Sequence, residues 1–248
     1  MNFEEYKIMR DLEDEYWWHR GMRSIIRDQL VPTIDSKSRL LDVGCGTGAN
    51  LRMLSEYCET AGIDVHSEAV RYSQERGLKN IVVGDGERLP FEDSSFTHAL
   101  SCAVLQVIPD DQACINETFR ILSPGGFFLI IESTYPILWS KHDLSQGSVR
   151  RYSKKDLQNK LEKAGFKIES FSYATKTVLP LIMATRLASK ALRPPRKLDP
   201  EKTKSDLFRL PAPINSAIYH IFEKEWKNSL FAKLPFGLTI IALASKPR

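Results

Sequence analysis

The sequence has little of what marks a nucleic-acid binder or a metalloprotein. Its 248 residues hold 35 Lys and Arg against 31 Asp and Glu, so the net charge is only +4. That excess is too small to indicate nucleic-acid binding without a clustered basic face. Only five histidines and four cysteines occur, and the cysteines form no C-x-x-C pair and no zinc spacing. We therefore expect no nucleic-acid partner, no metal site, and reduced thiols, as in a cytoplasmic protein.

The chain also lacks a recognisable targeting or membrane segment. The first residues are acidic and have no apolar core, which argues against a cleaved signal peptide. The most apolar long window, 121–140, contains two prolines, two glycines and Glu132. We expect it to form a turn, a strand and a loop, and we expect no integral membrane segment.

What the sequence does have is a regular alternation of short apolar runs and helical patterns. Apolar residues make up 42% of the chain, enough for an ordinary globular core. Strands are expected at 39–43, 60–64, 80–83, 96–102, 126–132 and 167–173, and helices at 49–57, 67–76, 111–122 and 153–164. This alternation predicts βα units around a mostly parallel sheet.

The segment LLDVGCGTGANL, residues 40–51, is an expected buried strand that ends in Gly44, Gly46 and Gly48 and runs into a helix. Glycines let backbone amides approach a ligand, and the helix N-terminus favours an anionic group. A nucleotide-like ligand is therefore expected here. Because the letters also fit the dinucleotide fingerprint G-x-G-x-x-A through Ala49, the loop alone does not choose between cofactors.

Three acidic residues follow the first three expected strands in order. Asp42 lies two positions before the first glycine, where it could fix the loop or, through water, a cationic amino group. Asp64 ends the second strand, about 20 residues after the loop, where a carboxylate accepts hydrogen bonds from ribose hydroxyls. Asp85, in VVGDGERLPF, follows the third strand and could accept the adenine amino group.

With these residues the sequence resembles the class I S-adenosylmethionine-dependent methyltransferases of the type 11-like group. The resemblance runs from about Leu40 to Ala174 and is carried by LDVGCGTG, GIDVHSEAV, GDGERLPFEDSSFTHAL, VLQVIPD and RILSPGGFFLI. It implies an α/β fold, a Rossmann-like three-layer α/β/α sandwich. Its seven-stranded, mostly parallel sheet would have an antiparallel last strand at 238–244 and a helical insertion before it. It also implies S-adenosyl-L-methionine as cofactor and S-adenosyl-L-homocysteine as product.

The resemblance assigns cofactor contacts to residues at the ends of the first four strands. The implied set is Asp42, Gly44, Cys45, Gly46, Gly48, Asp64, Val65, Asp85, Gly86, Glu87 and Ser101. Within it, Asp42 and the glycines would hold the methionine part, Asp64 the ribose, and Asp85 with the backbone of the next two residues the adenine. We expect a single domain over 1–248. It would comprise an N-terminal helical lid (1–35), a cofactor-binding core (36–174), a helical insertion or substrate cap (175–236) and the last strand (237–248).

Methyl transfer needs alignment and exclusion of water more than it needs a base. The loop after the fourth strand, SCAVLQVIPDD, is poor in bases, which shifts attention to residues 135–157. There we predict His142 as the proton acceptor, with Asp143 or another carboxylate orienting it. Alternatively, His142 is an ordinary surface histidine.

The acceptor-binding set is predicted on the same loop and on the N-terminal aromatic cluster. Arg150 and Arg151 would bind an anionic part of the acceptor, with Tyr152 beside them and Trp18 on the lid. His19 is a second base candidate. The alternatives are a solvated Arg pair and an aromatic cluster that simply packs in the core.

The acceptor itself is expected to be small or amphiphilic, and family analogy adds glycan- or lipid-linked molecules. The apolar stretch 177–191 followed by the basic 193–197 resembles an interfacial helix, so peripheral membrane contact stays open beside a packed cap helix. A nicotinamide-dependent oxidoreductase is disfavoured because no tyrosine is followed four residues later by lysine. A nucleic-acid methyltransferase is disfavoured by the absence of N-P-P-Y. A catalytically inactive cofactor-binding scaffold is the alternative function. The sequence does not specify the acceptor atom or the oligomeric state.

Overall fold

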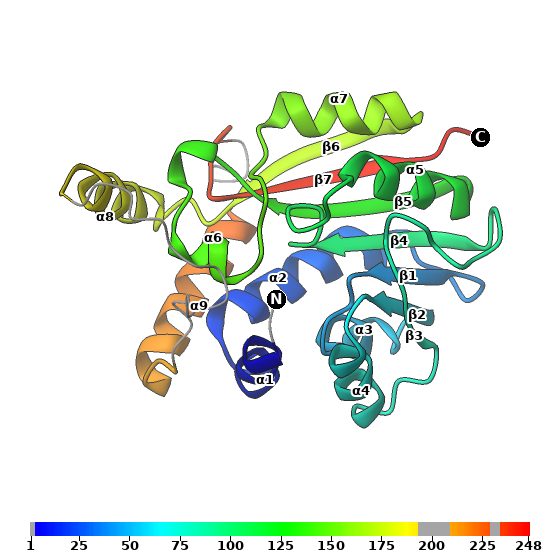
Figure 1. Ribbon diagram of the computed structural model, residues 1–248, viewed down its shortest axis with the longest axis horizontal. Helices are drawn as coiled ribbons and strands as arrows, with labels where there is room; N and C mark the ends of the chain where they lie inside the picture. Colours follow the sequence, from blue (N-terminus) through cyan, green and yellow to red (C-terminus); the bar gives the residue numbers. More distant parts are fainter. Residues whose placement is uncertain (1–2, 193–208, 229–233) are drawn as a thin grey trace.

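Seven strands form one sheet in the order β3-β2-β1-β4-β5-β7-β6. The computed structural model describes residues 3–192, 209–228 and 234–248 (Figure 1). The strands are β1 (Arg39–Val43), β2 (Glu59–Asp64), β3 (Ile81–Val83), β4 (Phe96–Cys102), β5 (Leu122–Ser133), β6 (Lys167–Ala174) and β7 (Thr239–Ser245). The first six overlap the strands that the alternation predicts, and β7 overlaps the last strand that the resemblance implies.

The sheet is parallel except for its last strand. β1 pairs in parallel with β2 and β4, β2 with β3, and β4 with β5. β7 runs antiparallel to both of its neighbours, β5 and β6. The carboxyl ends of the parallel strands therefore meet at one edge, where α/β folds place their ligands. The predicted Rossmann-like sheet with an antiparallel last strand is confirmed.

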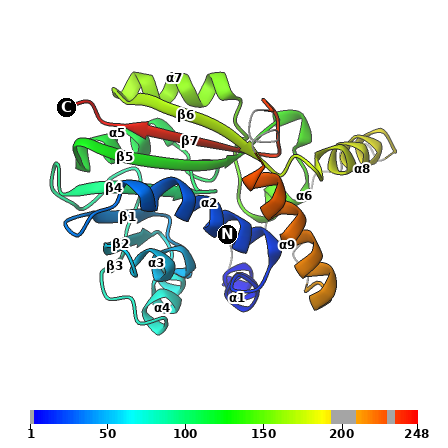
Figure 2. The same ribbon diagram turned by 180° about the vertical axis from the view of Figure 1, so that it is seen from behind.

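Helices cover both faces of the sheet (Figures 1 and 2). One face packs against α5 (Asp111–Ile121) and α7 (Lys154–Ala164), and the other against α2 (Trp17–Leu30), α3 (Ala49–Leu54) and α4 (Ser67–Glu75). Leu41 and Val43 of β1 join the first core cluster and Leu40 joins the second. Burial on both faces explains why the central strands read as continuous apolar runs.

The segments outside the βα repeat form further helices. They comprise α1 (Phe3–Leu12), α6 (Lys141–Ser145), α8 (Leu179–Leu192), α9 (Ala212–Lys227) and the short 3-10 turns η1 (Val31–Thr33) and η2 (Pro136–Leu138). A Cβ on Gly21 of α2 would lie 2.5 Å from the ring of Phe222 in α9. Glycine at this position lets the N-terminal segment and the insertion pack closely.

The expected insertion is helical, with two differences in extent. Within the insertion expected at 175–236, one helix is α9 over Ala212–Lys227, and residues 229–233 lie outside the described residues. The apolar stretch 177–191 forms most of α8, whereas the basic patch 193–197 also lies outside them. No helix within the described ranges is long and apolar enough to cross a membrane.

Candidate active site

A cavity of about 820 Å³ opens at the carboxyl ends of β1, β2, β4 and β5. Residues of α1, α2, α6 and α8 complete its wall. Eight residues of the predicted cofactor set line it: Gly44, Cys45, Gly46, Asp64, Val65, Asp85, Gly86 and Glu87. Asp42, Gly48 and Ser101 do not line it. The structure thus brings most of the predicted set to one cavity.

The glycine loop needs its glycines for steric reasons. Gly44 and Gly48 have positive φ angles of 72° and 82°, a backbone conformation that residues with a side chain rarely adopt. A Cβ on Gly44 would lie 2.5 Å from Val104, and one on Gly48 would lie 2.7 Å from Ser73. The loop therefore turns tightly from β1 into α3 and presents its backbone to the cavity.

Asp64, at the end of β2, is a buried carboxylate that already has three donors. Its Oδ2 accepts a bond from the Gly46 amide at 3.0 Å, and its Oδ1 accepts one from the His66 amide at 3.0 Å. The third donor is the Tyr6 hydroxyl of α1, at 3.1 Å from Oδ1. Burial, and then the Asp64 charge, raise the pKa of Tyr6 far above its ordinary value. Helix α1 therefore lies directly against Asp64, the residue predicted to bind the ribose.

Helix α1 is also fixed at its C-terminal end. Glu13 accepts hydrogen bonds from the Thr47 hydroxyl in the glycine loop and from Arg76, the latter at 2.7 Å. Arg76 donates in turn to the Thr47 carbonyl at 2.9 Å. Sequence reasoning missed Tyr6 and Glu13. The sequence did contain one indication of their role: Tyr6, Met9 and Glu13 are spaced so that they lie on one face of a helix.

Asp42 and Ser101 are buried polar residues behind the loop. Asp42 is 1% exposed, and neither carboxylate oxygen has a hydrogen-bond partner in the part of the chain that the structure describes. Burial, with a smaller contribution from the Asp64 charge, raises the pKa of Asp42 well above its ordinary value. The Ser101 hydroxyl, on the neighbouring strand β4, is likewise buried and has no partner among the described residues. Unpaired buried polar atoms indicate a ligand or ordered water.

Glu132, at the end of β5, is a cavity residue that the sequence analysis did not identify. Its Oε1 accepts bonds from the amides of Val104 and Leu105 at 3.0 and 2.8 Å. Its Oε2 is buried and, among the described residues, has no partner. Burial raises the pKa of Glu132 to about 8 despite these amide bonds. The only sequence signal was a lone acidic residue at the end of an apolar strand.

The predicted proton acceptor His142 lines the cavity from α6. The Asp143 carboxylate, expected to orient it, accepts two bonds from Arg151, at 2.7 and 3.0 Å, and one from the Ser140 amide. Arg151 also donates to the Thr134 carbonyl and lines the cavity. Asp143 therefore ties α6 to the segment after β5.

Arg150 and Tyr152 do not line this cavity. Arg150 donates to the carbonyl oxygens of Leu105, Ile108 and Pro109. Tyr152 is completely buried, and its hydroxyl donates to Asp111 at 2.6 Å. These contacts shape the loop after β4, and they argue against the predicted acceptor contacts of both side chains.

The aromatic cluster of α2 lines the cavity and packs at the same time. Trp17 and Trp18 border the cavity, while the Trp17 ring also contacts Phe222, with centroids 6.1 Å apart. His19 also lines the cavity. Its Nε2 is buried and has no hydrogen-bond partner among the described residues. Burial, and then the nearby Arg23, lower the pKa of His19 to about 3, so it is neutral at physiological pH.

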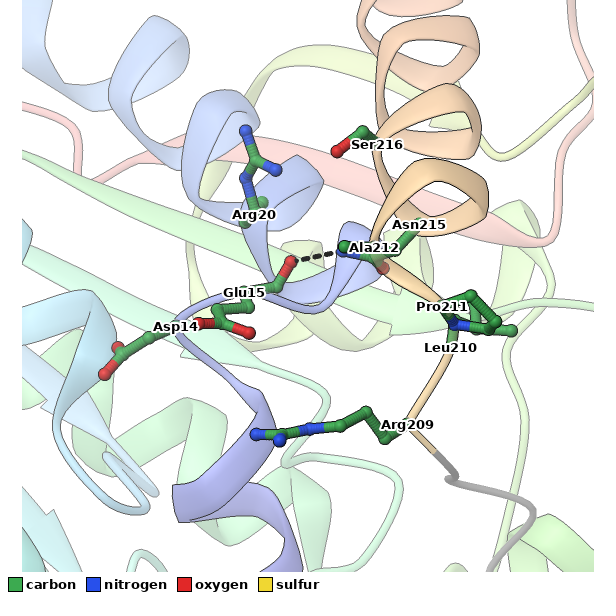
Figure 3. Close-up of a pocket in the computed structure, with 9 residues that line it drawn as sticks. All are labelled: Asp14, Glu15, Arg20, Arg209, Leu210, Pro211, Ala212, Asn215 and Ser216. Atoms are coloured by element: carbon green, nitrogen blue, oxygen red, sulfur yellow. Dashed lines mark hydrogen bonds between the residues drawn. The ribbon is translucent and has the colours of Figure 1, made fainter.

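A second cavity of about 740 Å³ lies between the α1–α2 link and the start of α9 (Figure 3). It shares no lining residue with the first. The Asn215 amide donates to the Glu15 carbonyl at 2.8 Å, and its Oδ1 accepts from the Trp17 amide at 2.9 Å. This side chain fastens α9 to the N-terminal segment.

Comparison with known proteins adds independent information. Residues 41–130 match the family model described as a methyltransferase domain. A demethylmenaquinone methyltransferase of Staphylococcus aureus is 30% identical over 146 residues, which cover 56% of this chain and 54% of that protein. The sterol 24-C-methyltransferase erg6 of Schizosaccharomyces pombe is 29% identical over 151 residues, covering 53% and 40%. The chain spans about half the length of the curated relatives it matches.

Solved structures share the fold over nearly the whole chain. A chain from the complex of the Haloferax volcanii Trm112 methyltransferase activator with a methyltransferase has a TM-score of 0.64 at 18% identity, covering 98% of this chain and 96% of its own. A Thermotoga maritima S-adenosylmethionine-dependent methyltransferase has a TM-score of 0.60 at 16% identity, covering 98% and 95%. At these identities the likeness concerns the fold alone.

Proposed function

We propose that this chain, whose residues 41–130 match the methyltransferase-domain family, is a class I S-adenosylmethionine-dependent methyltransferase that transfers the methyl group of S-adenosyl-L-methionine to a small or amphiphilic acceptor. One observation carries the proposal: the glycine loop, Asp64 and Asp85 border a single cavity of about 820 Å³. A cavity of this size is typical of sites for small molecules and cofactors. The four free cysteines support a cytoplasmic enzyme.

The residues present fit this cofactor. The methionine part carries a cationic amino group, and the buried carboxyl group of Asp42, which has no partner among the described residues, would accept a hydrogen bond from it through water. Gly46 lines the cavity without a side chain, and a Cβ there would lie 3.0 Å from Met9 on the facing wall. Asp64 would accept the ribose hydroxyls, and Asp85, with the backbone of the next two residues, would hold the adenine. When bound, the cofactor supplies a methyl group on a sulfonium, a leaving group that needs no further activation.

The chain's own contribution is then alignment and exclusion of water. The order of strands gives an order of subsites: adenine at β3, ribose at β2, and the methionine part at β1. The acceptor would enter beyond β1, at the ends of β4 and β5. There Trp18, Met22, Ile131 and Ile182 supply apolar wall, which supports an acceptor with an apolar part.

We propose His142 and Arg151 as acceptor-side residues, since both line the cavity. Arg150 and Tyr152 are left out because they do not line the cavity. Two relatives are named for methyl transfer to a sterol and to demethylmenaquinone, both amphiphilic molecules. They favour an amphiphilic acceptor, lipid- or glycan-linked, over nucleic acid.

Isothermal titration of the cofactor-stripped protein with S-adenosylmethionine and S-adenosylhomocysteine tests the proposal. We expect saturable binding, which Asp64→Ala and Gly46→Arg abolish, because the first removes the ribose ligand and the second fills the loop. Glu56→Ala, at an exposed carboxylate outside the cavity, is the matched control. Binding of NAD in place of both ligands would contradict the proposal.

Release of S-adenosylhomocysteine in the presence of an acceptor panel then separates an enzyme from an inactive cofactor-binding scaffold. The panel should hold amines, alcohols and phenols with and without long apolar chains. His142→Ala assigns the histidine: a loss of turnover with unchanged cofactor affinity is expected if it touches the acceptor.

A further inference from the structure

Three polar side-chain atoms that border the main cavity are buried and have no partner within residues 3–192, 209–228 and 234–248. They are His19 Nε2, Gln106 Oε1 and Glu132 Oε2. Their side chains come from three different elements: α2, the loop after β4, and the end of β5. Buried polar atoms without partners are rare because each loses its hydrogen bond to water. We expect a ligand that supplies hydrogen-bond donors.

Glu132 is the most firmly held of the three. The amides of Val104 and Leu105 fix its Oε1, so the carboxyl group has one orientation and Oε2 is left for a ligand. Ala103, directly before these amides, has a positive φ of 60°. A non-glycine residue in this conformation is strained, and such strain gathers at ligand-binding loops. The loop is therefore built around the Glu132 carboxyl group.

The strand order places Glu132 on the acceptor side. The ribose ligand Asp64 ends β2 and the glycine loop follows β1, whereas Glu132 ends β5. In the sheet β5 lies two strands from β1, about 10 Å at the usual spacing of strands. Strand β4 thus lies between Glu132 and the glycine loop that follows β1, and both line the same cavity.

We infer that Glu132 binds and deprotonates an amine or hydroxyl acceptor, an inference that rests on the proposed function. The acceptor's N–H or O–H donates to Oε2. As the lone pair of that nitrogen or oxygen forms the bond to the methyl carbon, the electrons of the carbon–sulfur bond stay on sulfur. The proton of the acceptor passes to Oε2. Gln106 Oε1 and neutral His19 accept further hydrogen bonds from the same molecule.

The environment of Glu132 suits this task. Its burial keeps water from competing for Oε2 and raises the pKa of the carboxyl group to about 8. A carboxylate with a raised pKa is a stronger base than one in water, and bases that titrate near the working pH are the most effective. The base that the loop after β4 lacks is therefore supplied by the neighbouring strand.

The test uses two cofactor analogues, because it then needs no identified acceptor. Sinefungin carries an amine-bearing carbon where the cofactor has its methylated sulfur, and S-adenosylhomocysteine has no group there. Isothermal titration of the wild-type protein should show sinefungin binding about tenfold more tightly, as a charge-assisted hydrogen bond provides. In Glu132→Gln this preference should disappear, while the affinity for S-adenosylhomocysteine stays unchanged. Gln can still accept the two amide bonds.

Ser133→Ala, at the next cavity residue along β5, is the control and should keep the preference. If Glu132→Gln does not fold, Glu132→Met replaces it, since its side chain has similar length and no buried donor. Equal affinity of the wild type for both analogues, or a preference that survives in the Glu132 variant, would overturn the inference. Failure of both analogues to bind would instead overturn the proposed function.

Discussion

At the scale of single residues, the Tyr6 hydroxyl occupies an acceptor position on Asp64. A carboxylate has about four lone-pair positions, and three donors already use Asp64. Two ribose hydroxyls would bring the donors above the number of lone-pair positions. One of the present donors must therefore leave, and we expect it to be the Tyr6 hydroxyl. We expect Tyr6→Phe to tighten S-adenosylhomocysteine binding about fivefold, because the cofactor would no longer have to displace one hydrogen bond. Isothermal titration measures this affinity.

The control for Tyr6 is Asp11→Ala, which changes an exposed residue of the same helix and should leave the affinity unchanged. Weaker binding to Tyr6→Phe than to the wild type would mean that the hydroxyl supports the cofactor instead of competing with it.

Glu132 gives a second residue-scale prediction, on stability. Burial raises the pKa of its carboxyl group from the ordinary 4.5 to about 8, so the folded state keeps a proton that the unfolded state has lost between these values. The contribution of this carboxyl group to the stability of the folded state is complete below about pH 4.5 and is lost as the pH rises through 8. Because Gln does not titrate, Glu132→Gln should gain stability relative to the wild type from pH 5 to 8. Urea unfolding across that range measures the difference, and a constant difference would contradict the prediction.

The residues that the sequence predicted and those that it missed differ in a physical way. Gly44, Gly46 and Asp64 act through the local conformation of a strand end and a turn, which neighbouring letters specify. Tyr6 and Glu132 act through contacts between segments far apart in the chain, such as Tyr6 with Asp64 and Glu132 with Leu105. Such contacts depend on how helices and strands pack, which one sequence does not give.

At the scale of elements, α6 is held by a buried ion pair. Asp143 and Arg151 are 2.7 Å apart, and both side chains are almost wholly buried. Arg151→Met would leave the Asp143 charge buried, with Arg186, at 3.9 Å, as its remaining ion-pair partner among the described residues. We expect a loss of about 3–5 kcal/mol of unfolding free energy, measured by urea denaturation. Asp143→Leu combined with Arg151→Met should recover part of it, and a single-variant loss below about 1 kcal/mol would contradict the prediction.

Most elements were predictable because apolar periodicity determines them, and the exceptions have local causes. The strand expected at 126–132 begins at Leu122, since Leu122 pairs with Phe96 before a shift in register. The Pro124-Gly125-Gly126 segment that indicates a turn is instead held in the strand, where the Gly125 amide donates to the Lys246 carbonyl. The partner strand, far away in sequence, overrides the local signal.

At the scale of the whole molecule, helix α8 of the insertion carries both side chains that border the cavity and exposed apolar side chains. On α8, Ile182 and Arg186 border the cavity, whereas Leu181 is 67% exposed and Leu187 40% exposed. Figures 1 and 2 show this helix projecting from the end of the sheet. An amphiphilic acceptor that resides in a membrane could therefore pass along α8 into the cavity without crossing water.

Co-sedimentation with vesicles of phosphatidylcholine and phosphatidylglycerol at low salt tests this route. We expect the wild type to bind and the double variant Leu181→Glu, Leu187→Glu to lose most of that binding, because two charges would enter the apolar contact. Val82→Glu, at an exposed apolar position of the opposite edge strand β3, is the matched control and should bind like the wild type. Equal loss in the control would indicate that added negative charge alone repels the vesicle. No binding by the wild type would leave α8 as a cap over an acceptor that arrives from water.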